Sequence, residues 1–237
     1  MLVLGHRGSR VPGPENTPQA ARAALEGGAD GFELDVRRSR DLQLVCVHDP
    51  FTGSDHGPRQ TVVETDAAQL GLPGIAEMLD AADGGRVVLE VKNNRRQPDY
   101  DGRRATTARL LAALLDERRS AGATDDVVVS SFDHIALVVA RAAGERTALL
   151  TVPGIPVTTG LRLLLRGGHA ELHAHVSALP KGMPRRAAAA VARAHDAGIS
   201  LIVWTVTSTT HDLRLRDVGV DGLICDDPAD VVRALSR

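Results

Sequence analysis

The sequence predicts an α/β fold, an eightfold β/α (TIM) barrel, on three observations. Short apolar runs alternate with helix-like segments about eight times, a pattern typical of parallel strands joined by right-handed crossovers. The runs are continuously apolar, as in Val127–Val129 and Leu201–Val203, which indicates strands covered on both faces. The chain has 237 residues, close to the ~250 typical of this barrel. A doubly wound open sheet is the alternative, but no glycine-rich dinucleotide-binding loop follows the first run.

The apolar runs give the expected strands in chain order. They are Leu2–His6, Gly31–Val36, Leu42–His48, Arg86–Lys92, Val127–Phe132, Thr147–Val152, Glu171–Val176, Ser200–Val206 and Asp221–Asp226. A barrel of this type closes with eight strands, so the run at 42–48 is in excess. We expect it either as an extra hairpin strand or as an extension of the loop after the second strand. The aperiodic stretch 49–74 is expected to be a short loop insertion at the same place.

The segments between the runs carry helix signals. Apolar residues recur at helical spacing, as in Ala21, Ala24 and Leu25. Thr17 precedes Pro18 and Asp227 precedes Pro228, and each pair places an N-cap residue before a proline at the first helical position. No shift in composition divides the chain. We therefore expect residues 1–237 to form one barrel domain.

Composition excludes several classes of partner. The chain has 28 basic and 30 acidic residues, a net charge of −2 that argues against nucleic acid or an acidic membrane surface as a partner. Two cysteines, Cys46 and Cys225, are too few for a disulfide framework and suit a reducing compartment. No run approaches the ~20 apolar residues of a membrane span. We expect a cytoplasmic protein, a monomer or homodimer.

Three carboxylates are predicted to meet at one end of the barrel. Active sites of this fold lie at the C-terminal ends of the strands. Glu33 and Asp35 lie near the end of the second strand and Glu90 near the end of another, and residues two apart share a face. Such a cluster is costly unless its charge is neutralised. A divalent cation, Mg²⁺ or Ca²⁺ in preference to zinc, is favoured. Lysine or arginine alone is the alternative.

Two histidines and two cations are expected at the same rim. His6 and His48 end two different runs, and histidine side chains serve as general acids and bases near neutral pH. The alternative is that each histidine only bonds backbone at a strand end. Arg7 and Lys92 would supply fixed positive charge, which suits a phosphate. Trp204, the single tryptophan, also lies near a strand end.

The ordered motifs resemble the glycerophosphodiester phosphodiesterase family. The matching runs are His6-Arg7-Gly8, Pro14-Glu15-Asn16-Thr17, Phe32-Glu33-Leu34-Asp35-Val36, Val47-His48-Asp49-Pro50, Leu89-Glu90-Val91-Lys92, Ser131-Phe132, Trp204-Thr205-Val206 and Gly219-Val220-Asp221-Gly222-Leu223-Ile224. They span nearly the whole chain. The resemblance implies a barrel of the phospholipase C-like phosphodiesterase type.

The resemblance also assigns roles to the matching positions. The implied metal ligands are Glu33, Asp35 and Glu90. The implied acid–base pair is His6 and His48, and the implied substrate contacts are Arg7, Lys92 and Trp204, the last beside glycerol. Glu15 and Asn16 fit a supporting shell. The implied reaction is metal-dependent hydrolysis of a glycerophosphodiester, a small molecule, to sn-glycerol 3-phosphate and an alcohol, with the substrate's 2-hydroxyl or water as nucleophile.

Departures from the family pattern keep two alternatives open. Thr207 stands where asparagine is usual, Cys225 stands where threonine is common, and the run 51–56 replaces an arginine-threonine run. One alternative is a related phospholipase D-type barrel acting on lysophospholipid or sphingolipid head groups. The other is a catalytically silent barrel that serves as a binding module. His173 and His175 share a strand face, and His175 is the better candidate for a substrate contact.

Overall fold

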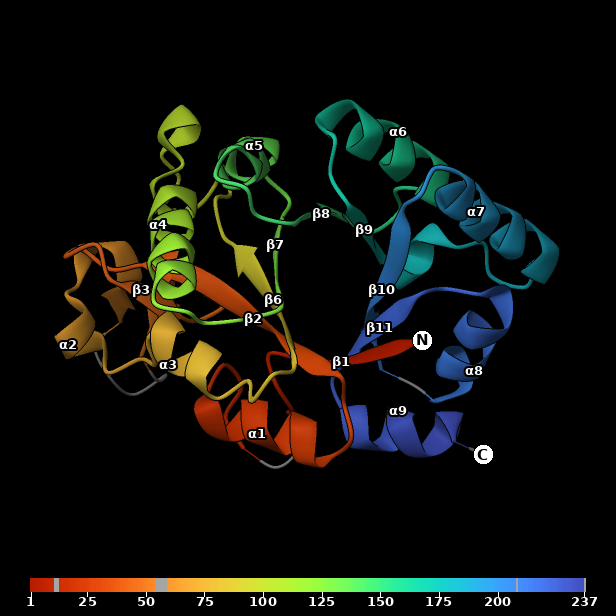
Figure 1. The fold of residues 1–237 in the computed structure, drawn as a ribbon, viewed down its shortest axis with the longest axis horizontal. Helices are drawn as coiled ribbons and strands as arrows, with labels where there is room; N and C mark the ends of the chain where they lie inside the picture. The colour runs from red at the N-terminus through yellow and green to blue at the C-terminus, as the bar shows by residue number, and fades with distance from the viewer. Residues whose placement is uncertain (11–12, 54–58, 208, 237) are drawn as a thin grey trace.

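Eight parallel strands close into a barrel ringed by helices (Figure 1). The computed structural model describes residues 1–10, 13–53, 59–207 and 209–236. The barrel strands are β1 (Leu2–His6), β2 (Gly31–Arg38), β6 (Arg86–Val91), β7 (Val127–Ser131), β8 (Thr147–Thr151), β9 (Glu171–His175), β10 (Ser200–Val206) and β11 (Gly222–Cys225). Strand β1 pairs in parallel with both β11 and β2, which closes the ring. The predicted barrel is confirmed, and the open-sheet alternative is wrong.

The surplus apolar run forms an extra hairpin strand. Strand β3 (Leu44–Cys46) pairs antiparallel with the end of β2, with Cys46 opposite Val36. It is shorter than the predicted run because Leu42, with φ of 63°, belongs to the turn that connects the two strands. His48 lies beyond the strand, in the loop that follows it.

The predicted insertion at 49–74 contains regular structure. Its elements are β4 (Phe51–Thr52), β5 (Gln60–Thr61), the 3-10 helix η1 (Val62–Glu64) and α2 (Ala67–Leu70). Strands β4 and β5 pair antiparallel with each other. Residues 54–58 of the insertion lie outside the described part of the chain. The segment is therefore a small subassembly beside the barrel rather than a plain loop.

The other helices alternate with the barrel strands. They are α1 (Pro18–Glu26), α3 (Ile75–Asp80), α4 (Thr106–Ser120), α5 (His134–Ala142), α6 (Val157–Gly167), α7 (Pro184–Asp196), α8 (Thr209–Val218) and α9 (Pro228–Leu235), with 3-10 turns η2 (Gly102–Arg104) and η3 (Val176–Ala178). The predicted N-caps Thr17 and Asp227 each accept a backbone N–H. The C-terminal end of α1 lies next to α9 (Figure 1), where Gly27 and Gly28 approach Ala229 and Val232, which joins the first and last parts of the chain. Among the helices described, none is long and apolar enough to cross a bilayer.

The barrel interior is an apolar layer with a polar layer above it. The buried inward residues of the apolar layer are Leu4, Val88, Val128, Ala148, Ile202 and Ile224. Because inward positions recur every two residues, the next ones along the strands include His6, Glu90, Ser130 and Trp204. The apolar layer thus forms the floor under the polar residues at the C-terminal mouth.

A buried ion-pair group lies at the opposite end of the barrel. Glu171 on β9 is 1% exposed and accepts from His173, and it forms ion pairs with Arg86 at 3.3 Å and Arg146 at 2.8 Å. Burial alone would raise the pKa of Glu171, but the His173 hydrogen bond and the two arginines hold it below its ordinary value. The carboxylate therefore stabilises the fold above pH ~4.5, and this contribution is lost as the pH falls through the lowered pKa.

Replacing Glu171 with alanine is expected to lower the free energy of unfolding at pH 7 by about 2 kcal/mol, because it leaves the buried His173 without its acceptor and removes the carboxylate that Arg86 and Arg146 contact. Urea unfolding followed by circular dichroism measures this. The control is Asp116→Ala, which breaks the exposed pair with Arg119 and should change stability little. An equal effect of the two substitutions, or a Glu171→Ala effect that does not shrink in acid, would contradict the prediction.

Candidate active site

The predicted site residues converge on a cavity at the barrel mouth. This cavity has a volume of about 210 Å³, and every predicted site residue except Asp35 lines it. Asp35 lies directly behind the lining, where it contacts Arg7 and Lys92. Ser130 and His173 complete the polar part of the wall, and Phe132 adds an apolar ring. The C-terminal ends of the strands therefore bring together site residues that lie far apart in the sequence.

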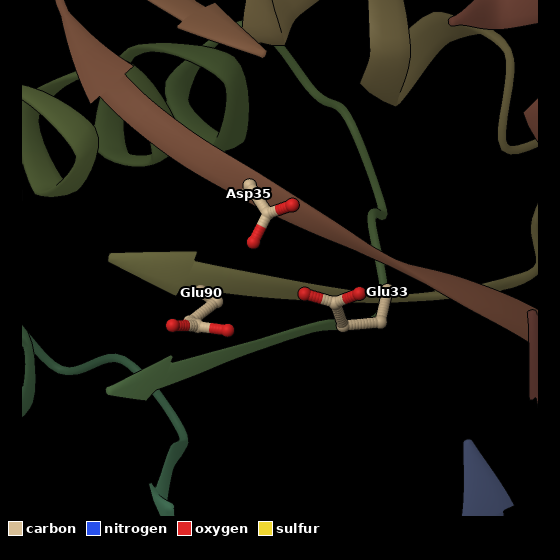
Figure 2. A group of neighbouring side chains, drawn as sticks. All are labelled: Glu33, Asp35 and Glu90. Carbon is tan, nitrogen blue, oxygen red and sulfur yellow. The ribbon is translucent and has the colours of Figure 1, made fainter. Parts of the chain in front are cut away.

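The three carboxylates form one cluster (Figure 2). Glu33 and Asp35 lie on β2 and Glu90 on the neighbouring β6, where Asp35 stands opposite Glu90 in the ladder. One oxygen from each lies within 4.8 Å of the others. Glu33 Oε1 is buried and has no hydrogen-bond partner among the described residues. An all-carboxylate set with an unsatisfied oxygen fits a hard divalent cation.

Two cations partly balance this cluster. Lys92 Nζ lies 2.7 Å from Asp35 Oδ1 and 2.6 Å from Glu90 Oε1, and Arg7 Nε lies 3.2 Å from Asp35 Oδ2. Burial opposes ionisation of Asp35, but Lys92 and Arg7 lower its pKa to about 2. Burial and the charges of Asp35 and Glu90 raise the pKa of Glu33 well above its ordinary value. Negative charge at Glu33 is thus under-compensated, which a bound cation would relieve.

The turn after β1 places Arg7 over the carboxylates. Arg7 and Asn16 both have left-handed backbone, with φ of 56° and 59°. Arg7 Nη1 donates to Glu15 Oε1 at 2.5 Å, and the Arg7 backbone N–H donates to Glu33 Oε2 at 3.1 Å. Asn16 is buried, and its side chain donates to Asp35 Oδ2 at 2.9 Å. Glu15 and Asn16 thus hold Arg7 and Asp35, as a supporting shell would.

His6 is oriented by a residue that the sequence analysis did not single out. Its Nδ1 lies 2.7 Å from Asp226 Oδ1. Burial would raise the pKa of Asp226, but His6 and Arg10 lower it, so the carboxylate is ionised and accepts a hydrogen bond from the Nδ1–H group of His6. Nε2 then faces the cavity, 4.0 Å from Glu33 Oε2. The available signal was strand parity, because Asp226 is the second residue after Ile224, an inward residue.

His48 is held through its backbone by a buried arginine. Arg37 is 1% exposed, and its Nε and Nη2 donate to the His48 carbonyl at 2.9 and 2.6 Å. Arg37 also forms an ion pair with Asp99. His48 Nδ1 lies 2.8 Å from Asp49 Oδ1, and its ring is half-exposed. Arg37 was missed although it shares the strand face of Glu33 and Asp35.

Trp204 forms the apolar wall of the cavity. Its indole N–H donates to the His173 carbonyl at 3.1 Å, and its ring stacks edge-to-face with Phe132 and His175 at centroid distances of 5.6 and 5.1 Å. His175 Nδ1 bonds Ser177 in η3 rather than lining the cavity. The histidine of this strand that reaches the cavity is His173.

A second cavity of about 620 Å³ adjoins the first. Four residues line both, namely His48, Glu90, Lys92 and Phe132. The rest of the second cavity is formed mainly by the loop after β6 and by the end of β7. His6 and Trp204 border only the smaller cavity.

Solved structures share this fold. A phosphodiesterase from Oleispira antarctica, solved with the product sn-glycerol-3-phosphate, aligns with a TM-score of 0.84 at 24% identity over 100% of this chain and 97% of that one. A glycerophosphodiester phosphodiesterase from Thermotoga maritima aligns with a TM-score of 0.78 at 22% identity, covering 98% and 97%. At these sequence identities, the structural similarity establishes the barrel fold.

Sequence comparison establishes the family. A glycerophosphodiester phosphodiesterase from Caldanaerobacter subterraneus subsp. tengcongensis is 26% identical over an alignment of 256 positions, which covers 100% of this chain and 98% of that protein. A probable glycerophosphodiester phosphodiesterase 1 from Mycobacterium tuberculosis is 55% identical over 48 residues, 20% of this chain and 18% of that protein. The model of the glycerophosphoryl diester phosphodiesterase family matches residues 6–230. The chain therefore belongs to this family of phosphodiester-hydrolysing enzymes.

Proposed function

We propose that this enzyme hydrolyses glycerophosphodiesters to sn-glycerol 3-phosphate and an alcohol in a metal-dependent reaction. The observation that carries the proposal is the cluster of three carboxylates, two cations and two histidines around one small cavity. The product named for the Oleispira antarctica phosphodiesterase is consistent with it.

Glu33, Asp35 and Glu90 would hold a divalent cation, Mg²⁺ or Ca²⁺. When bound, such a cation stabilises negative charge on phosphoryl oxygens. Arg7 and Lys92 lie beside the cluster, and their fixed charges would contact the phosphate of the substrate. Because both cations are held by carboxylates of the cluster, they are positioned before the substrate arrives.

The two cavities suggest different roles for the two histidines. The family resemblance implies that Trp204 lies beside glycerol, and Trp204 borders the 210 Å³ cavity, so we assign the glycerol moiety to that side. His48 lines both cavities and is placed at the bond to the departing alcohol, which it protonates. His6 borders the glycerol side, and its Nε2 accepts the proton of the nucleophile while Asp226 stabilises the ring's positive charge.

Cavity size favours a glycerol moiety without an acyl chain. The glycerol side is about 210 Å³, below the ~300–1,000 Å³ of pockets for drug-sized ligands. We expect choline release from glycerophosphocholine with kcat/KM at least about 100-fold above that for a short-chain lysophosphatidylcholine kept below its micelle concentration. Both substrates carry the same leaving group, so the comparison isolates the acyl chain. Equal rates would instead support the phospholipase D-type alternative.

A further inference from the structure

We propose that the 620 Å³ cavity is a head-group subsite that selects alcohols carrying a carboxylate or phosphate over those carrying a quaternary ammonium. The inference rests on the proposed function, which gives the alcohol side of the substrate to this cavity. Two properties of the cavity support it: which residues form its wall and which of their charges are unpaired among the described residues.

The cavity is continuous with the catalytic residues. His48, Glu90 and Lys92 line both it and the smaller cavity. A phosphodiester with its phosphate beside Lys92 and its glycerol beside Trp204 therefore directs its other ester group past His48 into the larger cavity. That cavity has room for a head group the size of a phosphorylated polyol.

The wall is a fixed part of the structure. Its loop, residues 93–101, begins at Asn93, which is 7% exposed and donates to the Asp133 carboxylate. Arg37 on β2 donates to Gln97 Oε1 at 3.0 Å and forms an ion pair with Asp99, which is 2% exposed. Arg38 donates to the Asp99 carbonyl at 2.9 Å. These bonds tie the loop to the barrel on both sides of Arg95 and Arg96.

The charged side chains of this wall that have no ion-pair or hydrogen-bond partner among the described residues are positive. Arg95 and Arg96 line the cavity with exposed side chains. Among the residues that the structure describes, neither guanidinium has an acidic partner within ion-pair distance. The nearby acids are engaged, since Glu90 pairs with Lys92 while Asp133 accepts from Asn93 and caps α5. Two uncommitted guanidinium groups bind carboxylate or phosphate well.

The wall lacks the features that recognise a quaternary ammonium. Such a cation is bound by a cage of aromatic faces. Among the described residues lining this cavity, Phe132 is the only Phe, Tyr or Trp, and its ring packs edge-to-face against Trp204, which borders the smaller cavity. A choline head group would therefore meet two arginines and a single phenyl ring rather than an aromatic cage. An anionic head group would meet two charge-assisted donors.

Steady-state kinetics with three substrates test the subsite: glycerophosphoinositol 4-phosphate, glycerophosphoinositol and glycerophosphocholine. We expect kcat/KM for the phosphorylated inositol substrate to exceed that for the choline substrate by about tenfold. Arg95→Ala/Arg96→Ala should lower kcat/KM about tenfold for the phosphorylated substrate and less than twofold for glycerophosphocholine. The matched control is Arg103→Ala/Arg104→Ala, an exposed arginine pair in η2 that lines neither cavity and should change none of the three values.

The outcomes separate the two proposals. Hydrolysis of all three substrates without a preference for the phosphorylated one overturns the subsite. So does an equal loss on every substrate in Arg95→Ala/Arg96→Ala, or the same loss in the control pair. No hydrolysis of any substrate overturns the proposed function, and the subsite with it. Substitution of these exposed side chains leaves the unfolding midpoint unchanged, which thermal unfolding verifies.

Discussion

Replacing Glu33 with glutamine should lower kcat/KM for glycerophosphodiester hydrolysis by at least about 100-fold. The substitution keeps the shape of the side chain and removes the negative charge of the carboxylate. The Oε1 atom of this carboxylate has no hydrogen-bond partner among the described residues. The readout is glycerol 3-phosphate release under saturating Mg²⁺ or Ca²⁺. Glu117→Gln, on the exposed face of α4, is the matched control and should retain full activity.

The same substitution should stabilise the metal-free protein at pH 7. Burial and the neighbouring carboxylates raise the pKa of Glu33, so the folded state binds its proton more tightly than the unfolded state does. Stability therefore falls as the pH rises above ~4.5, the unfolded pKa, toward the raised folded pKa, and Glu33→Gln removes this penalty. Lost activity together with a higher unfolding midpoint distinguishes a ligand residue from a structural one. Lost activity with a lower midpoint would indicate misfolding instead.

Removing either histidine should cost about 10²–10⁴-fold in kcat on glycerophosphocholine. The activities of the two variants should differ on a substrate whose leaving group departs without a proton. With a glycerol 4-nitrophenyl phosphodiester, His48→Ala should regain most of its activity, since nitrophenolate needs no general acid. His6→Ala should stay impaired, because the nucleophile still needs a base. Initial rates on both substrates measure this.

The control for the histidine pair is His195→Ala. His195 is a half-exposed residue of α7 paired with Asp221, away from the mouth, and its loss should leave both rates unchanged. Recovery of His6→Ala instead of His48→Ala on the nitrophenyl substrate would reverse the two roles. Full activity of either variant on glycerophosphocholine would remove that residue from the mechanism.

Strand parity explains how much of the site could be read from the sequence. Glu33, Asp35 and Glu90 interrupt apolar runs at positions where alternation points them inward, so their meeting at one rim was predictable. Asp226 and Arg37 obey the same parity, but Asp226 ends its predicted run and Arg37 lies one residue beyond its own, where a charged residue also suits solvent. Their roles become visible only in the structure, where Asp226 contacts His6 and Arg37 donates to the His48 carbonyl.

The insertion and the cavities required the structure. Strands β4 and β5 are two residues each, too short for a period, and they form because Phe51 pairs with Thr61 and Thr52 pairs with Gln60. The loop wall at 93–101 depends on Arg37 and Arg38 reaching Asp99 from β2, a contact across about 60 residues of chain. No local pattern encodes such a contact, so neither the second cavity nor its charge was predictable.

The central claim is that Glu33, Asp35 and Glu90 form a divalent metal centre. Thermal unfolding of chelator-treated protein tests it directly when Mg²⁺ or Ca²⁺ is then added to the wild type and to Glu33→Gln. At an ion concentration 100 times Kd, the wild-type midpoint should rise by about 5 °C or more, in parallel with restored glycerol 3-phosphate release, while the variant midpoint stays fixed. Chelator-insensitive activity, or an equal shift in both proteins, would contradict the metal centre.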